Sequence, residues 1–114
     1  MFSKREHIIN KAVKATFSAF KSSTPKISMH LFYGLFDESP EKLVIWYLFE
    51  TYADLETAKT SGLCAEIEKG TIHNLLSGGY PAEAFETSEK VKVCFTTQED
   101  VDKKADGDYR LYFQ

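Results

Sequence analysis

The side chains of this chain that are best suited to metal binding or covalent chemistry are His7, His30, His73, Cys64 and Cys94. A zinc site needs three or four convergent ligands, and catalytic zinc sites are often signalled by ligands that are close in the sequence. No close pair occurs here: Cys64 and His73 fall on one predicted helix, but they are nine residues apart and well separated along its axis. The sequence therefore predicts no metal site.

The two cysteines also lack the surroundings of a nucleophile. A reactive thiol needs a neighbouring base and electropositive surroundings. Cys94 lies beside Phe95 in an apolar stretch, as a packed thiol does, and Cys64 is followed by two glutamates whose charges disfavour a thiolate. No glycine-rich phosphate loop follows a strand, and no carboxylate is identifiable as a general acid. We therefore expect a protein that is not an enzyme and uses no cofactor.

A run of aspartates at residues 100–108 suggests calcium binding. Counted from Asp102, however, Lys104 stands where a second acidic ligand of an EF-hand loop belongs, and Phe113 stands at the closing glutamate position. We interpret the run as a solvated turn that can serve as an acidic docking surface.

The charge of the chain is unevenly distributed. Residues 1–26 hold six basic side chains and one acidic side chain, whereas residues 27–114 hold eight basic and sixteen acidic ones, within a total net charge of −3. A nucleic-acid-binding protein is more often basic, with its cations gathered on one face, so no nucleic-acid partner is expected. The acidic remainder favours a basic protein partner, because complementary potentials speed encounter and exclude wrong partners.

Targeting signals are not apparent. No apolar run approaches the roughly 20 residues that span a bilayer, and the N-terminus does not read as a secretory signal. The two distant cysteines are expected to be reduced thiols. We therefore expect a cytoplasmic protein without a membrane partner.

Capping signals and hydrophobic periodicity divide the chain into elements. Ser3 to Glu6 matches a reciprocal capping box and begins a helix that Pro25 ends, and residues 97–100 predict a short helical turn. The other elements expected are strands in 27–36, 43–49, 91–95 and 109–113 and a helix from Asp54 to Ser77 that breaks near Gly62 or Gly70. We predict a single α+β domain over residues 1–114, in the order α-β-β-α-β-β. Its four-stranded, mainly antiparallel sheet would carry two helices on one face.

The strands in 27–36 and 43–49 are apolar on both faces. A strand that packs on one helical layer and faces water on its other side should alternate apolar and polar residues. In the second stretch Leu43, Ile45 and Tyr47 face one way and Val44 and Trp46 the other. A chain of 114 residues has few elements with which to cover a sheet twice. We therefore expect another surface on the second face, either a homodimer seam or a partner anchored at Trp46.

The C-terminal third contains Gly79-Tyr80-Pro81, then Phe95 to Asp102, then Gly107-Asp108-Tyr109. With the small acidic α+β character of the chain, this segment resembles the immunity proteins of contact-dependent growth inhibition and related polymorphic toxin systems. The resemblance implies binding and neutralisation of a cognate toxin domain, typically a nuclease whose basic groove an acidic inhibitor can occupy. The residues we expect at the contact are Asp37, Glu38, Glu41, Trp46, Glu99, Asp100, Asp102, Asp106 and Asp108.

Two other functions fit the same sequence. A small acidic dimeric secretion chaperone would bind an unstructured segment of an effector, whereas an immunity protein would bind a folded toxin. A small-molecule sensor or enzyme would instead hold a ligand between sheet and helices, and its melting temperature would rise with ligand concentration.

Overall fold

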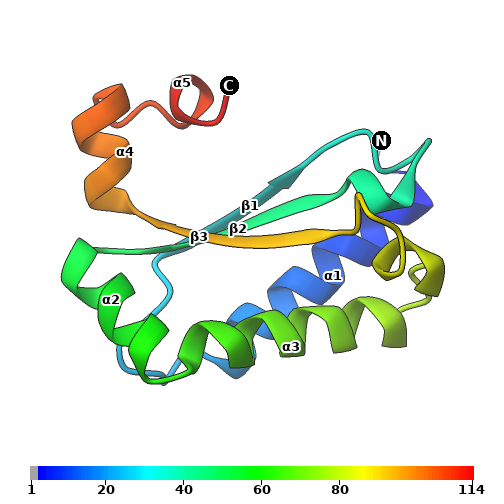
Figure 1. Ribbon diagram of the computed structural model, residues 1–114, viewed down its shortest axis with the longest axis horizontal. Helices are drawn as coiled ribbons and strands as arrows, with labels where there is room; N and C mark the ends of the chain where they lie inside the picture. The colour runs from blue at the N-terminus through cyan, green and yellow to red at the C-terminus, as the bar shows by residue number, and fades with distance from the viewer. Residues whose placement is uncertain (1–2) are drawn as a thin grey trace.

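The computed structural model describes residues 3–114 and shows a helical layer on one face of a small sheet, with a C-terminal helical segment on the other face (Figure 1). Its elements in chain order are α1 (Lys4–Ala19), β1 (Met29–Tyr33), η1 (Pro40–Lys42), β2 (Val44–Phe49), α2 (Tyr52–Thr60), α3 (Leu63–Ser77), η2 (Ala82–Phe85), β3 (Lys92–Thr97), α4 (Gln98–Ala105) and α5 (Tyr109–Tyr112).

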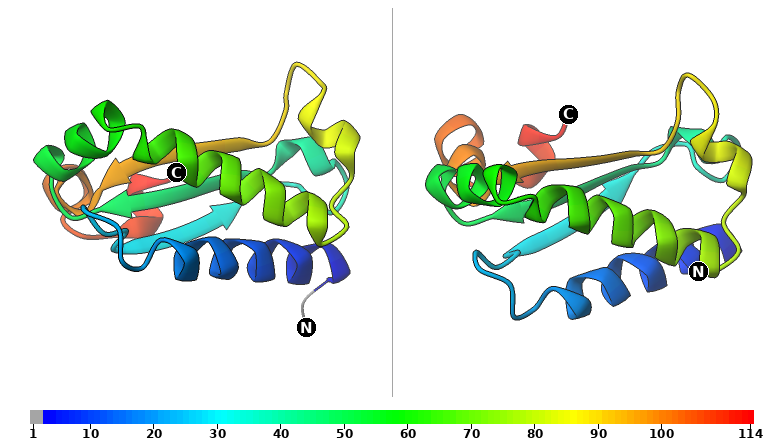
Figure 2. Two further views of the ribbon diagram at one scale, coloured as in Figure 1. Left: turned by 90° about the horizontal axis from the view of Figure 1, so that it is seen from below. Right: turned by 60° about the horizontal axis from the view of Figure 1, so that its bottom comes forward.

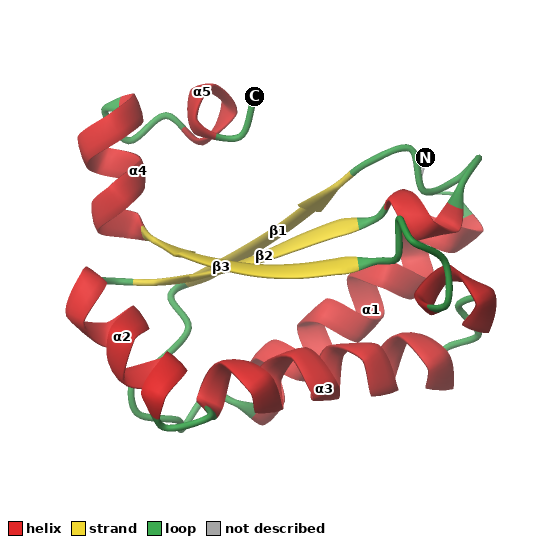
Figure 3. Ribbon diagram, in the orientation of Figure 1, coloured by secondary structure: helices red, strands yellow, loops and turns green. Residues whose placement is uncertain are grey.

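The sheet has three strands in the order β1-β2-β3, so the predicted four-stranded, mainly antiparallel sheet with two helices is wrong. β1 and β2 form the expected antiparallel hairpin, but β3 is parallel to β2. Parallel strands require a long crossover connection, and α2 with α3 supplies it by returning the chain along the sheet (Figure 3).

The predicted last strand at residues 109–113 is instead the helix α5. Asp108 determines this outcome, because its side chain accepts hydrogen bonds from the backbone N–H groups of Arg110 (2.9 Å) and Leu111 (3.2 Å). Such a cap satisfies amides that begin a helix and bends the chain away from the extended conformation. The segment therefore does not join the sheet.

The helix starts and breaks follow local sequence signals. Ser3 caps α1 by accepting from the amide of Glu6 at 3.0 Å, as the capping box predicted. The predicted helical break occurs at Gly62, which has a φ of +86°, whereas Gly70 continues within α3. Thr51, not Asp54, caps α2.

The core lies between the helices and one face of the sheet. α1 and α3 lie side by side below the sheet (Figure 2) and contribute Ile9, Val13 and Ile67, each with no exposed surface. A buried polar contact joins the two layers, since the Tyr47 hydroxyl lies 2.8 Å from Thr71 Oγ1. The apolar burial and this satisfied hydrogen bond hold the sheet rigidly on its helical layer.

The second face of the sheet is the one for which the sequence analysis found no covering element within the chain. The strand register places Leu31, Trp46 and Cys94 in one row across it and Tyr33, Val44 and Lys92 in the next. α4 and α5 lie on this side of the sheet (Figure 1), so the chain itself supplies part of the cover. Within residues 3–114, no helix is long and apolar enough to cross a membrane.

Candidate functional site

The C-terminal acidic residues predicted as partner contacts are largely engaged within the protein. Glu99 Oε1 accepts a hydrogen bond from the backbone N–H of Tyr52 at 2.9 Å and so satisfies an amide in the first turn of α2. Asp106 ends α4 in the left-handed conformation (φ 55°), and Asp108 caps α5. Asp102 is exposed and accepts from the Gln98 side chain at 3.0 Å. Glu99 and Asp108 thus help to organise the C-terminal segment, while Asp102, Asp106 and Asp108 stay exposed.

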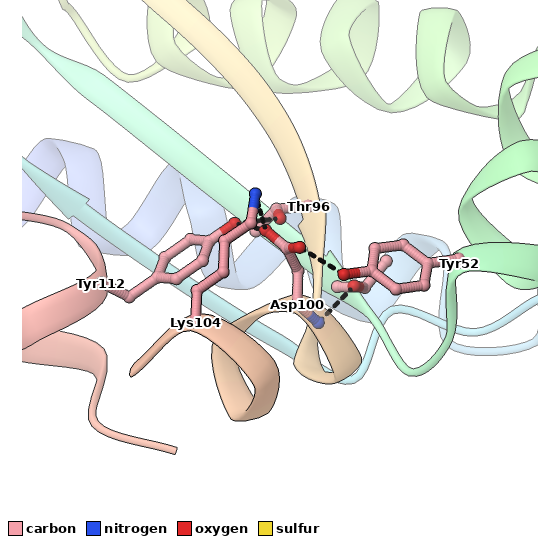
Figure 4. Close-up of polar contacts among 6 residues, drawn as sticks. Tyr52, Thr96, Asp100, Lys104 and Tyr112 are labelled. Atoms are coloured by element: carbon pink, nitrogen blue, oxygen red, sulfur yellow. Dashed lines mark hydrogen bonds and ion pairs between the residues drawn. The ribbon is translucent and has the colours of Figure 1, made fainter. Parts of the chain in front are cut away.

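Asp100 is the most strongly engaged of these residues (Figure 4). It is only 8% exposed, and its two carboxylate oxygens accept hydrogen bonds from the hydroxyls of Tyr52 and Tyr112. The Tyr112 hydroxyl also lies 2.7 Å from Thr96 Oγ1, and Lys104 Nζ lies 3.4 Å from Asp100 Oδ2. The cluster thus joins α2, β3, α4 and α5 at one carboxylate.

The electrostatics of this cluster favour an ionised acceptor. The hydrogen bonds from Tyr112 and Tyr52 hold the pKa of Asp100 below its ordinary value. In return, the hydrogen bond to Asp100 raises the pKa of Tyr52 to about 12. A carboxylate with a depressed pKa and occupied oxygens is a poor general base. We interpret the cluster as a clasp for the C-terminal helices.

The segment 37–42, which ends in η1 and holds the other predicted acidic residues Asp37, Glu38 and Glu41, lies at the opposite end of the sheet, at the right of Figure 1. The structure adds three glutamates that the sequence analysis missed, which follow the crossover in η2 and the loop after it. We call these six carboxylates the acidic end: Asp37, Glu38, Glu41, Glu83, Glu86 and Glu89.

The two segments of the acidic end are held together by packing between η1 and η2. The Tyr80 hydroxyl donates to the Pro40 carbonyl at 2.5 Å, and Glu41 and Glu89 line one hollow of about 210 Å³. The three-residue spacing of residues 83, 86 and 89, in a segment without an apolar stripe, is the sequence signal that could have identified them.

The carboxylates of the acidic end are not neutralised by ion pairs. Across residues 3–114 the ion pair present is that of Lys104 with Asp100, at the other end of the molecule. Asp37 accepts from Ser3 Oγ at 2.7 Å, and five of the six residues are exposed, Glu41 being half-buried. The acidic end therefore presents six carboxylates on a fixed scaffold, with Lys42, Lys90 and Lys92 lining the same hollow as Glu41 and Glu89.

Trp46 is not near the acidic end but in a groove beneath α5. Its Nε1 donates to the Tyr33 hydroxyl at 3.0 Å, and its ring centroid lies 5.2 Å from that of Phe113. We call the hollow of about 430 Å³ at this place the aromatic groove, which is lined by Tyr33, Trp46, Lys104, Leu111, Tyr112, Phe113 and Gln114. The predicted site residues thus separate into the acidic end, the C-terminal clasp and the aromatic groove.

The histidines and cysteines do not converge. His30 lies between the rings of Phe17 and Tyr47, and burial lowers its pKa. Burial also raises the pKa of the Cys64 and Cys94 thiols. Within residues 3–114, no three potential ligand side chains are grouped as a metal site.

The sequence matches no protein-family model, and the searches of curated proteins and of solved structures find no match either.

Proposed function

We propose that this chain is a cytoplasmic immunity protein that binds a folded toxin domain, a nuclease by preference, and blocks its access to substrate. No catalytic step belongs to this function, because the protein acts by occupying a surface. The observation that carries the proposal is the acidic end, with six carboxylates from two segments on a rigid scaffold and no ion pair among them.

The physical argument is charge complementarity. A nuclease binds the phosphate backbone of its substrate in a basic groove, and fixed carboxylates can occupy the same potential. The acidic end projects from the hairpin and the η2 loop, and the N-terminus of α1 lies against it, since Arg5 donates to the Phe36 and Asp37 carbonyls. A basic partner would therefore contact the exposed carboxylates of this end, whose attraction is reduced by the neighbouring Lys42 and Lys90.

The test is the association rate between the full chain and each purified product of the genes that flank its own, among which the proposal requires a toxin domain. We expect the double variant Glu38→Lys and Glu86→Lys to lower the association rate constant roughly tenfold at low salt, because steering by complementary charge is lost. The difference from wild type should shrink as salt screens the charges.

A matched variant separates local contact from net charge. Glu56→Lys with Glu66→Lys makes the same change in net charge on exposed positions of α2 and α3. This control should retain an association rate within about twofold of wild type. Equal effects of the two double variants, or wild-type rates in both, would remove the acidic end from the proposed contact.

A further inference from the structure

The two C-terminal helices lie on the same face of the sheet but are anchored differently (Figure 1). α4 buries Val101 and Ala105, which are 0% and 4% exposed. α5 contains no buried residue, and its Leu111 is 55% exposed. Residues 109–114, which we call the lid, are therefore held in place by much less buried apolar surface than α4.

The bend between α4 and the lid completes the end of α4 without help from α5. Asp106 and Gly107 have positive φ values of 55° and 82°. The Gly107 N–H donates to the Val101 carbonyl at 3.3 Å. The Asp108 N–H donates to the Ala105 carbonyl at 2.8 Å. A left-handed bend that returns its amides to the last turn is a common helix ending, so these carbonyls stay satisfied whether or not the lid lies on the sheet.

Three aromatic side chains fix the lid in its closed position, and each contacts one residue outside it. These contacts join Tyr109 to Gln98, Tyr112 to Asp100 and Phe113 to Trp46. α5 itself has four residues, far fewer than a helix needs to be stable alone, so its conformation depends on these contacts. Loss of one of them is expected to loosen the whole lid.

The residues that the lid covers keep polar partners when it opens. Asp100 retains the hydrogen bond from the Tyr52 hydroxyl and its ion pair with Lys104. Trp46 Nε1 retains the Tyr33 hydroxyl as its acceptor. Because neither the carboxylate nor the indole N–H is left unpaired, opening costs mainly the contacts of the three aromatic side chains.

We propose that the lid is a conformational switch, which opens as a unit about the bend at Asp106 and Gly107 while α4 stays on the sheet, and thereby uncovers Trp46. The hydrogen bond from Tyr112 to Asp100 is the latch that sets the open fraction. Opening changes the surface that the molecule presents without unfolding its core. The switch does not involve the acidic end, which lies at the other end of the sheet (Figure 1).

The test is hydrogen exchange of individual backbone amides in the full chain, followed by NMR. In wild type we expect the amides of Leu111, Tyr112 and Phe113 to share one opening equilibrium. They should exchange at least about 100-fold faster than amides in the middle of α4, after correction for the rates of an unstructured chain. Global unfolding alone cannot produce this difference, because it exposes both helices together.

Two hydroxyl deletions at the same carboxylate identify the latch. Tyr112→Phe should speed exchange in the lid roughly tenfold and leave exchange in α4 within about twofold of wild type, since a hydrogen bond to a charged group is lost. Tyr52→Phe is the matched control, because it removes a hydroxyl from Asp100 on the side of α2. This control should leave exchange in the lid within about twofold of wild type.

A third variant tests whether α4 is independent of the lid. Phe113→Ala removes the ring that lies 5.2 Å from that of Trp46, centroid to centroid. Trp46 is the only tryptophan, so its emission reports on this place alone and should shift to the red. Exchange in α4 should remain within about twofold of wild type, because the bend completes that helix by itself.

Exchange of the lid and α4 at one rate in wild type would overturn the proposal, because the two helices would then open only together. Graded rates along residues 111–113 would overturn it as well, since the end would then fray instead of opening as a unit. Equal acceleration of the lid by Tyr112→Phe and Tyr52→Phe, or faster exchange in α4 of Phe113→Ala, would also contradict it. None of these outcomes bears on the charge-reversal test of the acidic end, so the switch and the proposed function are tested separately.

Discussion

Asp100 has a role in the structure that its sequence pattern predicted only in part. Its position in the capping signature at residues 97–100 was correctly recognised, since its amide donates to Thr97 Oγ1 at 2.9 Å. Its carboxylate, however, is bonded by Tyr52 and Tyr112, which lie 48 and 12 residues away. A sequence pattern reports local spacing, so the clasp could not have been predicted from it. Within the predicted solvated turn, Asp100 is a junction of four elements, whereas Asp102, Asp106 and Asp108 are exposed.

We expect the clasp to make stability depend on pH. The pKa of Asp100 is lowered in the folded protein, so its contribution to the free energy of unfolding is fully present above about pH 4 and is lost as the pH falls through the lowered pKa. Asp100→Asn should lower the free energy of unfolding at pH 7 by about 1 kcal/mol. Urea unfolding at a series of pH values measures this difference, which should shrink toward pH 3. A constant difference over that range would contradict the assignment.

The elements themselves were predicted with mixed success. The first helix, the hairpin and the break at Gly62 follow from capping, alternation and glycine conformation, and all three are confirmed. The strand predicted at residues 109–113 was wrong, because a short alternating pattern fits one helical turn as well as a strand. The parallel pairing of β3 could have been predicted, because a long helical connection between two strands is typical of a crossover.

The hairpin depends on one glycine whose backbone no other residue can match. Gly34 has a φ of +123°, and a Cβ built there would lie 2.1 Å from the Lys42 carbonyl oxygen. We expect Gly34→Ala to lower the free energy of unfolding by about 3 kcal/mol or more, through backbone strain and this collision. Gly79→Ala is the matched control, since Gly79 also has a positive φ but open space around it, and it should cost about 1 kcal/mol. Equal losses in urea unfolding would show that the collision is relieved by movement of the loop.

At the scale of the whole molecule, the doubly apolar strands have a partial explanation within one chain. The C-terminal residues 107–114 pack on Trp46 through Phe113, while Tyr33 remains 39% exposed on the same face. The separation of the nine predicted contact residues into the acidic end, the clasp and the aromatic groove could not be predicted, because it depends on the direction of each strand. The structure does not test the homodimer expected from the sequence, but the cover that residues 107–114 supply within one chain leads us to expect a monomer instead.

Light scattering coupled to size-exclusion chromatography measures the oligomeric state directly. Because residues 107–114 cover part of this face within one chain, we expect the mass of one chain, 13.0 kDa, at micromolar concentrations. Trp46→Asp should remain folded by circular dichroism, because Trp46 lies on the half-covered face outside the buried core. A mass of two chains that falls to one in Trp46→Asp would instead support the homodimer.

The crossover also has a consequence for the order in which the chain folds. β1 and β2 are neighbours in the sequence, whereas β3 pairs with β2 only after the segment between Phe49 and Lys92 has closed on itself. Closing a long loop costs entropy before its contacts compensate, so such pairings form slowly. The hairpin with its helices therefore assembles first, with one edge of β2 unpaired. During that interval the chain offers an open strand edge to its neighbours, and the arrival of β3 closes it.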